Sequence, residues 1–159
     1  MKNRNKKIVS LSAIIKKIRN LKGKKIIFTN GCFDILHYGH VKYLRDARDK
    51  GDILIVGLNS DKSVRKIKGK NKPINPQFDR AEVLSALEAV DYVVIFDDDT
   101  PFKLINSIKP HVLIKGADWQ KRKIVGADIL KAYGGKVATI PLVKNRSTSK
   151  IIKKIARLF

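Results

Sequence analysis

Hydrophobic positions along the chain alternate between short continuous runs and stretches with helical spacing. The continuous runs are rich in β-branched residues, which is typical of buried strands. They cover residues 24–31, 52–59, 92–96, 111–116 and 136–142. Between and around the runs, apolar residues recur every three or four positions, which predicts amphipathic helices. These helices are expected at about 8–21, with Ser10 or Ser12 as its cap, and at about 39–50, 78–89, 124–133 and 148–159. A short helix is expected after a cap at Ser60-Asp61, and another opens at Pro101.

This alternation predicts a single α/β domain over residues 1–159, in which residues 1–24 form a basic tail and a lead-in helix. We expect a Rossmann-like, doubly wound parallel sheet of about five strands, with helices on both faces. In such sheets ligands bind beyond the carboxyl ends of the strands, where the strand order reverses. The functional site is therefore expected at that edge.

Charge is concentrated at the two ends of the chain. The 159 residues carry 35 Lys and Arg against 14 Asp and Glu, a formal net charge of +21. Residues 1–25 contain ten of these bases and no acid, and residues 121–159 contain eleven bases and one acid, so the middle is almost neutral. Such a balance fits nucleic acid, an anionic membrane or phosphate-rich substrates, or reflects a compositional bias toward lysine.

Several observations narrow the class of protein. A single cysteine, Cys32, excludes an internal disulfide, which fits the reducing cytosol. We identify neither a signal peptide nor an apolar run long enough to cross a membrane, so a cytoplasmic protein without a membrane partner is expected. No nucleic-acid reader motif or aromatic-interleaved basic patch occurs, which disfavours nucleic acid as the partner.

The chemistry-bearing residues follow the first expected strand, in the turn GCFDILHYGH at 31–40. Gly31 allows a tight exit from the strand, and Gly39 allows backbone to approach a ligand closely. His37 and His40 are three residues apart at the start of a helix, where free N–H groups and the positive helix end attract phosphate. Three alternatives remain for the histidines: a structural role, metal ligation with Cys32 or Asp34, and acid–base catalysis.

The pattern G-x-F-D followed by H-x-G-H resembles the nucleotidylyltransferase superfamily. The strings TNGCFDILHYGHVKYLRDA, IKGADW and STSKIIKKI, with the segment between them, are similar to the heptose 1-phosphate adenylyltransferase domain that is often fused to a heptose kinase. The resemblance implies transfer of AMP from ATP to D-glycero-β-D-manno-heptose 1-phosphate, which releases pyrophosphate and gives ADP-heptose for lipopolysaccharide core synthesis. A glycerol-3-phosphate cytidylyltransferase-like enzyme and an archaeal-type FAD synthetase are the alternatives within the superfamily.

The resemblance also implies a cofactor and partners. Magnesium (Mg²⁺) would neutralise the triphosphate of ATP, which is the co-substrate, while no protein metal ligand is expected. A separate heptose kinase would supply the sugar 1-phosphate. Self-association into a homo-oligomer is a further expectation by resemblance.

Residue roles follow from the resemblance. The paired His37 and His40 would contact the α- and β-phosphates of the nucleotide, and Lys42 is either a third catalytic phosphate contact or a solvated lysine. A group on or near the first turn would bind nucleotide: Asn30, Gly31, Cys32, Phe33, Asp34 and Gly39. Asp34 would orient His37, hold the loop, or act only as the acceptor of an Asx turn. Arg80 would lie near phosphates or at an interface.

A second signature, Ser147-Thr148-Ser149, would hold the β- and γ-phosphates at a helix N-terminus, or would be an ordinary cap. The expected glycine before it is replaced by Asn145-Arg146, and asparagine tolerates a left-handed turn. Polar residues at the ends of other strands would complete the nucleotide or sugar pocket: Asn59, Asp61, Lys115, Gly116, Asp118 and Trp119, the last as a stacking or lid residue. The run at 97–99 fits a helix-capping loop better than a metal site.

Overall fold

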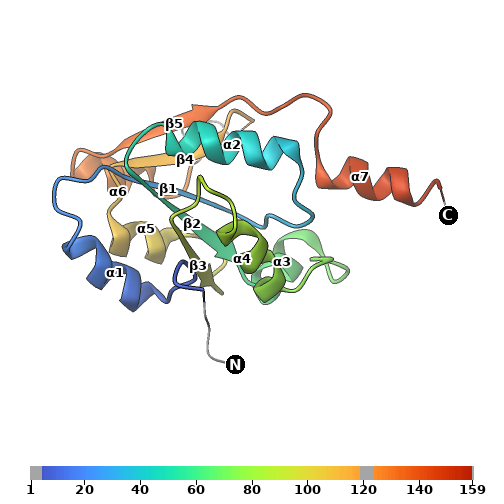
Figure 1. Cartoon of the computed structure of the whole chain (residues 1–159), viewed down its shortest axis with the longest axis horizontal. Coiled ribbons are helices and arrows are strands. Elements are labelled where there is room, and N and C mark those ends of the chain that lie inside the picture. Colours follow the sequence, from blue (N-terminus) through green and yellow to red (C-terminus); the bar gives the residue numbers. More distant parts are fainter. Residues whose placement is uncertain (1–4, 119–123, 159) are drawn as a thin grey trace.

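Five parallel strands form one sheet in the order β3-β2-β1-β4-β5 (Figure 1). This computed structural model describes residues 5–118 and 124–158. The strands are β1 (Ile26–Gly31), β2 (Ile53–Asn59), β3 (Tyr92–Phe96), β4 (Val112–Gly116) and β5 (Lys136–Ile140). The expected parallel α/β sheet is therefore confirmed, and its strand order reverses between β1 and β4.

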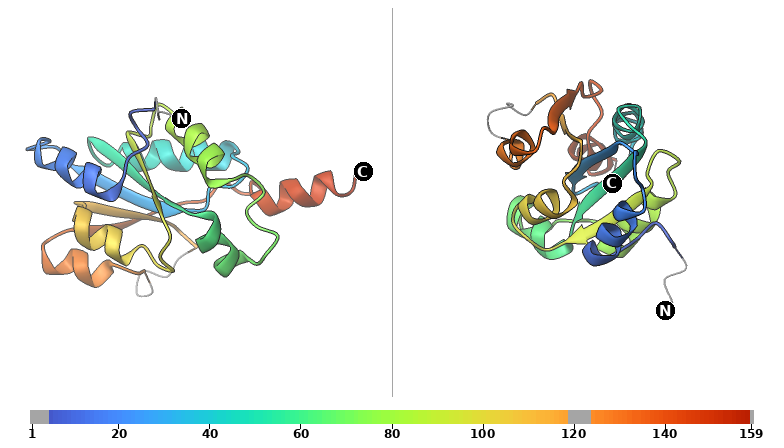
Figure 2. Two further views of the ribbon diagram at one scale, coloured as in Figure 1. Left: turned by 90° about the horizontal axis from the view of Figure 1, so that it is seen from below. Right: turned by 90° about the vertical axis from the view of Figure 1, so that its left-hand side faces the viewer.

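Helices cover both faces of the sheet. They are α1 (Leu11–Arg19), α2 (Tyr38–Arg48), α3 (Asp61–Lys68), α4 (Gln77–Ser85), α5 (Phe102–Ile108), α6 (Ala127–Ala132) and α7 (Thr148–Ile155). Side chains alternate along β1, so Ile27 packs toward α2 and α4 on one face, whereas Phe28 packs toward α1, α5 and α6 on the other. The left panel of Figure 2 shows α2 and α4 on the opposite side of the sheet from α5 and α6.

Two helices are shorter at their N-terminal ends than the apolar spacing predicts. In the first, the apolar spacing starts at Ile8, but Ile8 forms a parallel bridge with Val93 beside β3. Helix α1 begins after Ser10, one of the two serines expected to cap it, which accepts from the Ala13 N–H. The sixth was expected from residue 124. It begins after Gly126, whose φ of 92° interrupts the helix.

The last helix, α7, ends at Ile155 instead of continuing to the last residue, and none of its residues is buried. It extends away from the sheet, beyond the carboxyl ends of the strands (Figure 1). No helix in residues 5–118 and 124–158 combines the length and hydrophobicity needed to cross a bilayer.

Candidate functional site

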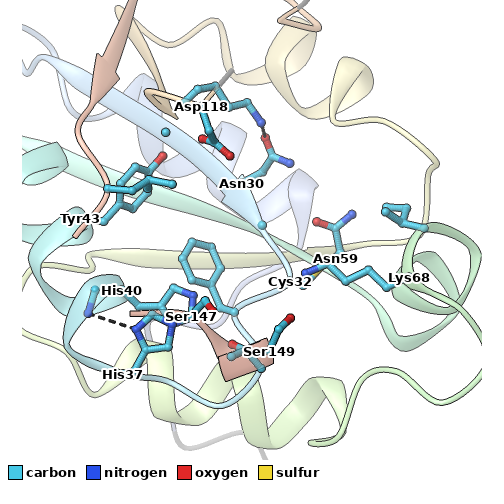
Figure 3. A pocket seen from close by; sticks show the side chains of 18 of the residues that line it. Asn30, Cys32, His37, His40, Tyr43, Asn59, Lys68, Asp118, Ser147 and Ser149 are labelled. Carbon is cyan, nitrogen blue, oxygen red and sulfur yellow. Dashed lines mark hydrogen bonds between the residues drawn. The ribbon is translucent and has the colours of Figure 1, made fainter. Parts of the chain in front are cut away.

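A cavity of about 640 Å³ lies beyond the carboxyl ends of the central strands (Figure 3). Its floor is formed by Asn30 and Gly31 of β1, Asn59 of β2, and Lys115 and Gly116 of β4. It therefore spans β1 and β4, where the strand order reverses, which is the usual ligand position in a sheet of this kind.

The two histidines of the first turn line this cavity and stack on each other. His37 is the N-cap of α2, and its Nδ1 accepts from the Gly39 N–H at 3.1 Å. The neutral His37 ring consequently carries its proton on Nε2. The His40 ring lies 3.9 Å from that of His37, centroid to centroid, and Phe33 packs against it edge-on at 5.5 Å. Helix α2 thus presents a fixed imidazole pair to the cavity.

Both imidazoles are held in their neutral form. Burial lowers the pKa of His37, and the nearby positive charge of Arg146 lowers it further. Burial lowers the pKa of His40 to about 4, with further contributions from His37 and Lys68. The His40 Nδ1 is buried and has no hydrogen-bond partner within the part of the chain that the structure describes.

Gly39 makes room for the histidine pair. A Cβ on Gly39 would lie 2.9 Å from Cε1 of His37 and 3.2 Å from Cβ of Arg146. The glycine that was expected to let the backbone approach a ligand therefore also makes room for the His37 ring. Gly31 does the same for Phe33, because a Cβ there would lie 3.0 Å from the Phe33 ring.

The N-terminus of α7 forms another part of the cavity wall, beside the N-terminus of α2. Ser147, Thr148 and Ser149 all line it. Ser147 caps the helix by accepting from the Lys150 N–H at 3.2 Å, and Thr148 Oγ1 donates to the backbone oxygen of Asp34 at 2.8 Å. Asn145 adopts the left-handed conformation anticipated for it, with a φ of 61°. Two helix N-termini, those of α2 and α7, therefore adjoin one cavity.

Apart from the histidines, three basic side chains and two carboxylates line the cavity. Lys115 is 8% exposed, and its Nζ donates to Asn30 Oδ1 at 2.5 Å. Burial lowers the pKa of Lys115 to about 8, while the charge of Asp118 opposes the shift. Lys68 at the end of α3 and Arg146 before α7 also line the cavity. This electrostatic environment favours an anionic ligand.

Asn59 and Cys32, which were both expected at the site, also line the cavity. Asn59 is buried, and its Nδ2 donates to Ser63 Oγ at 3.0 Å, which fixes the amide beside the cavity. Cys32 is half-buried, and burial raises the pKa of its thiol, so the thiol form is favoured.

Lys68 and Tyr43 also line the cavity, although neither was expected there. Tyr43 follows His40 by one helical turn, a spacing that places both residues on one face of α2 and could have identified it. Its hydroxyl is 2.8 Å from Thr29 Oγ1, which in turn donates to the backbone of Ile114. Lys68 is two turns away from the end of β2, and only the path of α3 brings it to the cavity.

Arg80 was expected near phosphates but does not line the cavity. Its side chain is almost fully buried and donates to Cys32 O at 2.5 Å, to Asn75 O at 3.0 Å and to Asp61 Oδ1 at 2.8 Å. Asp61 likewise lies outside the cavity lining, as the partner of Arg80. Both residues hold the first turn against α3 and the loop that precedes α4.

Asp34 is also buried outside the cavity lining. Its carboxylate accepts from the backbone N–H groups of Ile74 at 2.7 Å and Asn75 at 3.0 Å. Of the three roles considered for Asp34, holding a loop is the one that these contacts support, and the loop is the distant one before α4.

Two expected residues remain, Lys42 and Trp119. Lys42 is an exposed residue of α2 that pairs with Asp46 at 2.7 Å, and it does not line the cavity. Trp119 lies outside the described residues. Within the described ranges, no group of three or more His, Cys, Asp or Glu side chains could hold a metal ion.

Comparison with known proteins gives one consistent family. Residues 28–154 match the family described as cytidylyltransferase-like. The chain is 51% identical over 154 residues to the bifunctional protein HldE of Geobacter metallireducens, covering 97% of this chain and 31% of that protein. It is 56% identical over 146 residues to the protein of the same name from Wolinella succinogenes, covering 92% and 30% respectively. The chain thus spans about a third of the length of these relatives.

Solved structures share the fold. The lipopolysaccharide core biosynthesis protein from Thermoplasma volcanium superposes with a TM-score of 0.64 at 27% identity, over 78% of this chain and all of that one. A pantoate-beta-alanine ligase from Francisella tularensis, complexed with beta-gamma ATP and beta-alanine, has a TM-score of 0.60 at 19% identity, over 94% of this chain and 78% of that one. The second likeness concerns the fold alone.

Proposed function

Because this chain belongs to the cytidylyltransferase-like family, we propose that it is a nucleotidyltransferase that moves AMP from ATP to D-glycero-β-D-manno-heptose 1-phosphate. The products would be pyrophosphate and ADP-heptose, a precursor for the lipopolysaccharide core. The high identity to proteins named HldE and the sequence resemblance to heptose 1-phosphate adenylyltransferase domains support this substrate pair. A heptose kinase would supply the acceptor, and we propose that the reaction takes place in the cytoplasm.

The proposed reaction is an in-line displacement at the α-phosphorus of ATP. An oxygen of the sugar phosphate forms the new P–O bond, the bond between the α-phosphorus and the bridging oxygen breaks, and pyrophosphate leaves with the electron pair. No covalent enzyme intermediate is required. Catalysis of such a step depends on positioning the two substrates and on stabilising charge on the transferred and leaving oxygens.

The observation that carries the proposal is the stacked pair of His37 and His40 at the N-terminus of α2, inside a cavity with basic walls. A neutral imidazole keeps one ring N–H, which can donate to a phosphate oxygen. Negative charge from bound phosphates would favour protonation of both rings, which would strengthen the contact as pyrophosphate departs.

The N-terminus of α7 is suited to the outer phosphates. Its free backbone N–H groups and the hydroxyls of Ser147 and Ser149 adjoin the cavity beside the N-terminus of α2. Arg146 and Lys68 add positive charge on either side. A triphosphate held between the two helix N-termini would place its α-phosphorus near the histidines and leave the floor of the cavity for the acceptor or the base.

We propose that Mg²⁺ enters the site bound to the triphosphate and neutralises part of its charge. Asp99 and Asp118 are carboxylates that line the cavity and could hold the ion or its water ligands. Asp99 also pairs with Lys66 at 2.8 Å, which leaves one of its oxygens for such a contact.

A screen of substrate pairs tests this function. ATP and CTP would each be combined with heptose 1-phosphate, glycerol 3-phosphate and riboflavin phosphate, and pyrophosphate release would be followed with Mg²⁺ present and absent. We expect release with ATP and heptose 1-phosphate, and its loss in H37A and H40A variants that remain folded. Release with CTP and glycerol phosphate, or with ATP and riboflavin phosphate, would reassign the substrate. If no pair releases pyrophosphate and the protein binds random RNA or DNA in a salt-resistant manner, the proposed transferase activity is refuted.

A further inference from the structure

The hydrogen-bonded ladder between β1 and β4 ends where the cavity begins. Its last pair is Phe28 with Leu113, whereas β1 continues to residue 31 and β4 to residue 116. By contrast, β1 stays paired with β2 along its whole length. The residues beyond the ladder, at 30–31 and 115–116, form part of the cavity floor. The width of this opening between β1 and β4 therefore has to be fixed by bonds other than the ladder.

A threonine side chain bridges the opening directly beyond the ladder. Thr29 follows Phe28 on β1 and is fully buried, and its Oγ1 donates to the backbone oxygen of Ile114 at 3.1 Å. Ile114 follows Leu113 on β4, so this bond takes the place of the next rung of the ladder. The side chain of Thr29 faces α2, because Ile27, two residues earlier, packs toward that helix.

The hydroxyl of Tyr43 on α2 extends this bridge to the helix. It lies 2.8 Å from Thr29 Oγ1. A threonine hydroxyl has one proton, and Thr29 gives it to Ile114 O, so Tyr43 is the donor. Burial raises the pKa of Tyr43 to about 12, which keeps the phenol protonated for this role. Two hydrogen bonds, each with a defined direction, therefore join α2 to both β1 and β4.

Tyr43 also lies close to the histidine pair. It follows His40 by three residues, and both side chains line the cavity from α2 (Figure 3). The buried residues of α2, Leu44 and Ala47, lie in the second half of the helix. The Tyr43 bond ties the helix to the sheet on the side nearer the histidines, so a change in this bond would move the imidazoles relative to the cavity floor.

We propose that Tyr43 and Thr29 are positioning residues for nucleotidyl transfer, which fix the distance between the histidine pair and the floor of the cavity. An in-line displacement needs its reacting atoms aligned, and a displacement of about 1 Å lowers the rate about 100-fold. The bridge therefore affects turnover more than substrate binding, because the phosphates keep their direct contacts. The kinetic part of this inference rests on the proposed function, whereas the position of the rings does not.

Removing either hydroxyl tests the inference by steady-state kinetics of pyrophosphate release. Y43F should lower kcat about 10-fold and change the KM for ATP less than about 2-fold. T29V should lower kcat at least as much, since it breaks both bonds. The double variant should be no slower than T29V, because the two hydroxyls act as one chain. T29S keeps the hydroxyl and should retain kcat to within about 3-fold of wild type.

Y133F is the matched control. The hydroxyl of Tyr133 donates to the backbone oxygen of Pro110 at 2.9 Å, and Tyr133 does not line the cavity. Y133F thus loses one tyrosine hydrogen bond without touching the bridge, and it should keep wild-type kcat. The NMR resonances of the His37 and His40 rings in the ligand-free protein give a second measurement, because rings stacked at 3.9 Å shift each other's signals. Y43F should move these signals, and Y133F should not.

Three results would overturn the inference. The first is a Y43F variant that is folded by circular dichroism and keeps either wild-type kcat or unmoved histidine resonances. The second is a Y43F variant whose KM rises at unchanged kcat, since Tyr43 would then be a binding contact. The third is a T29S variant as slow as T29V, because the methyl group would then matter instead of the hydroxyl. If the wild type releases no pyrophosphate, the transferase proposal fails, and the histidine resonances still decide whether the bridge positions the rings.

Discussion

Lowering the pH from about 6.5 to 4 should destabilise the fold through His40. Burial holds the pKa of this ring at about 4 in the folded protein, against the ordinary histidine value of 6.5. Between these two values the unfolded chain binds a proton that the folded chain excludes. The free energy of unfolding therefore rises with pH across this window, and the stability is lost as the pH falls.

The size of the effect follows from the pKa difference. A full shift of this extent corresponds to about 3 kcal/mol at 1.36 kcal/mol per pKa unit. Because the ring lines an open cavity and is reached by solvent, we reduce this to about 2 kcal/mol. The pKa of His37 is lowered as well, so its contribution has the same sign.

Urea unfolding at several pH values between about 4 and 7 measures the effect. Wild-type protein should lose more stability on acidification than H40N, which cannot take up the proton. The chemical shift of the His40 ring, followed by NMR through the same range, gives the pKa directly. Two results would refute the conclusion that burial keeps the His40 ring neutral: parallel stability profiles for the two proteins, or a His40 ring that titrates near 6.5 in the folded state.

Two further substitutions test the parts that hold the site. G39A should lower kcat about 10- to 100-fold while leaving the thermal midpoint unchanged or slightly raised, because the new Cβ displaces the His37 ring but alanine favours the helix. T148V should raise the dissociation constant of ATP about 3- to 10-fold, measured by calorimetry, because it removes the bond to Asp34 O that anchors the N-terminus of α7, a bond worth about 1 kcal/mol.

Each substitution has a control of the same kind elsewhere in the chain. R45A introduces an alanine at an exposed position of α2 that does not line the cavity. T139V makes the same threonine-to-valine substitution as T148V, but on β5. Both controls should retain wild-type turnover and ATP affinity. An active G39A variant would mean that the His37 ring can move without consequence, and unchanged ATP affinity in T148V would return Thr148 to a local structural role.

Much of the fold follows from local patterns, and the differences have identifiable causes. The strands were predictable because buried parallel strands form continuous apolar runs. The Ser10 cap of α1 was among the expectations, whereas the start of α6 depends on Gly126, whose left-handed backbone a periodic apolar pattern does not reveal. Ile8 fits the helical spacing of α1, yet it pairs with Val93, because a sheet edge that is distant in sequence competes for the same backbone.

The site was predictable where a residue lies at a strand end or follows one directly. Asn30, Asn59 and Lys115 reach the cavity because carboxyl ends of parallel strands meet at one edge. Asp34 and Arg80 were also expected at the site. Their hydrogen bonds instead join segments far apart in the chain, Asp34 to the backbone of Asn75 and Arg80 to the backbone of Cys32. Which way such a side chain turns depends on how those segments pack, and no local spacing contains that information.

These long-range bonds explain how the turn between β1 and α2 keeps an unfavourable backbone. Phe33 and Ile35 both have a φ of 44°, which for side chains of this size costs on the order of 1 to 3 kcal/mol each. Arg80 bonds the carbonyl of Cys32, while Asp34 is bonded through its carboxylate to the loop before α4 and through its carbonyl to Thr148. A turn held from three sides in this way keeps its geometry before any ligand arrives. The histidines that follow it are consequently positioned in advance, which is the condition for stabilising charge in a phosphoryl-transfer transition state without reorganisation.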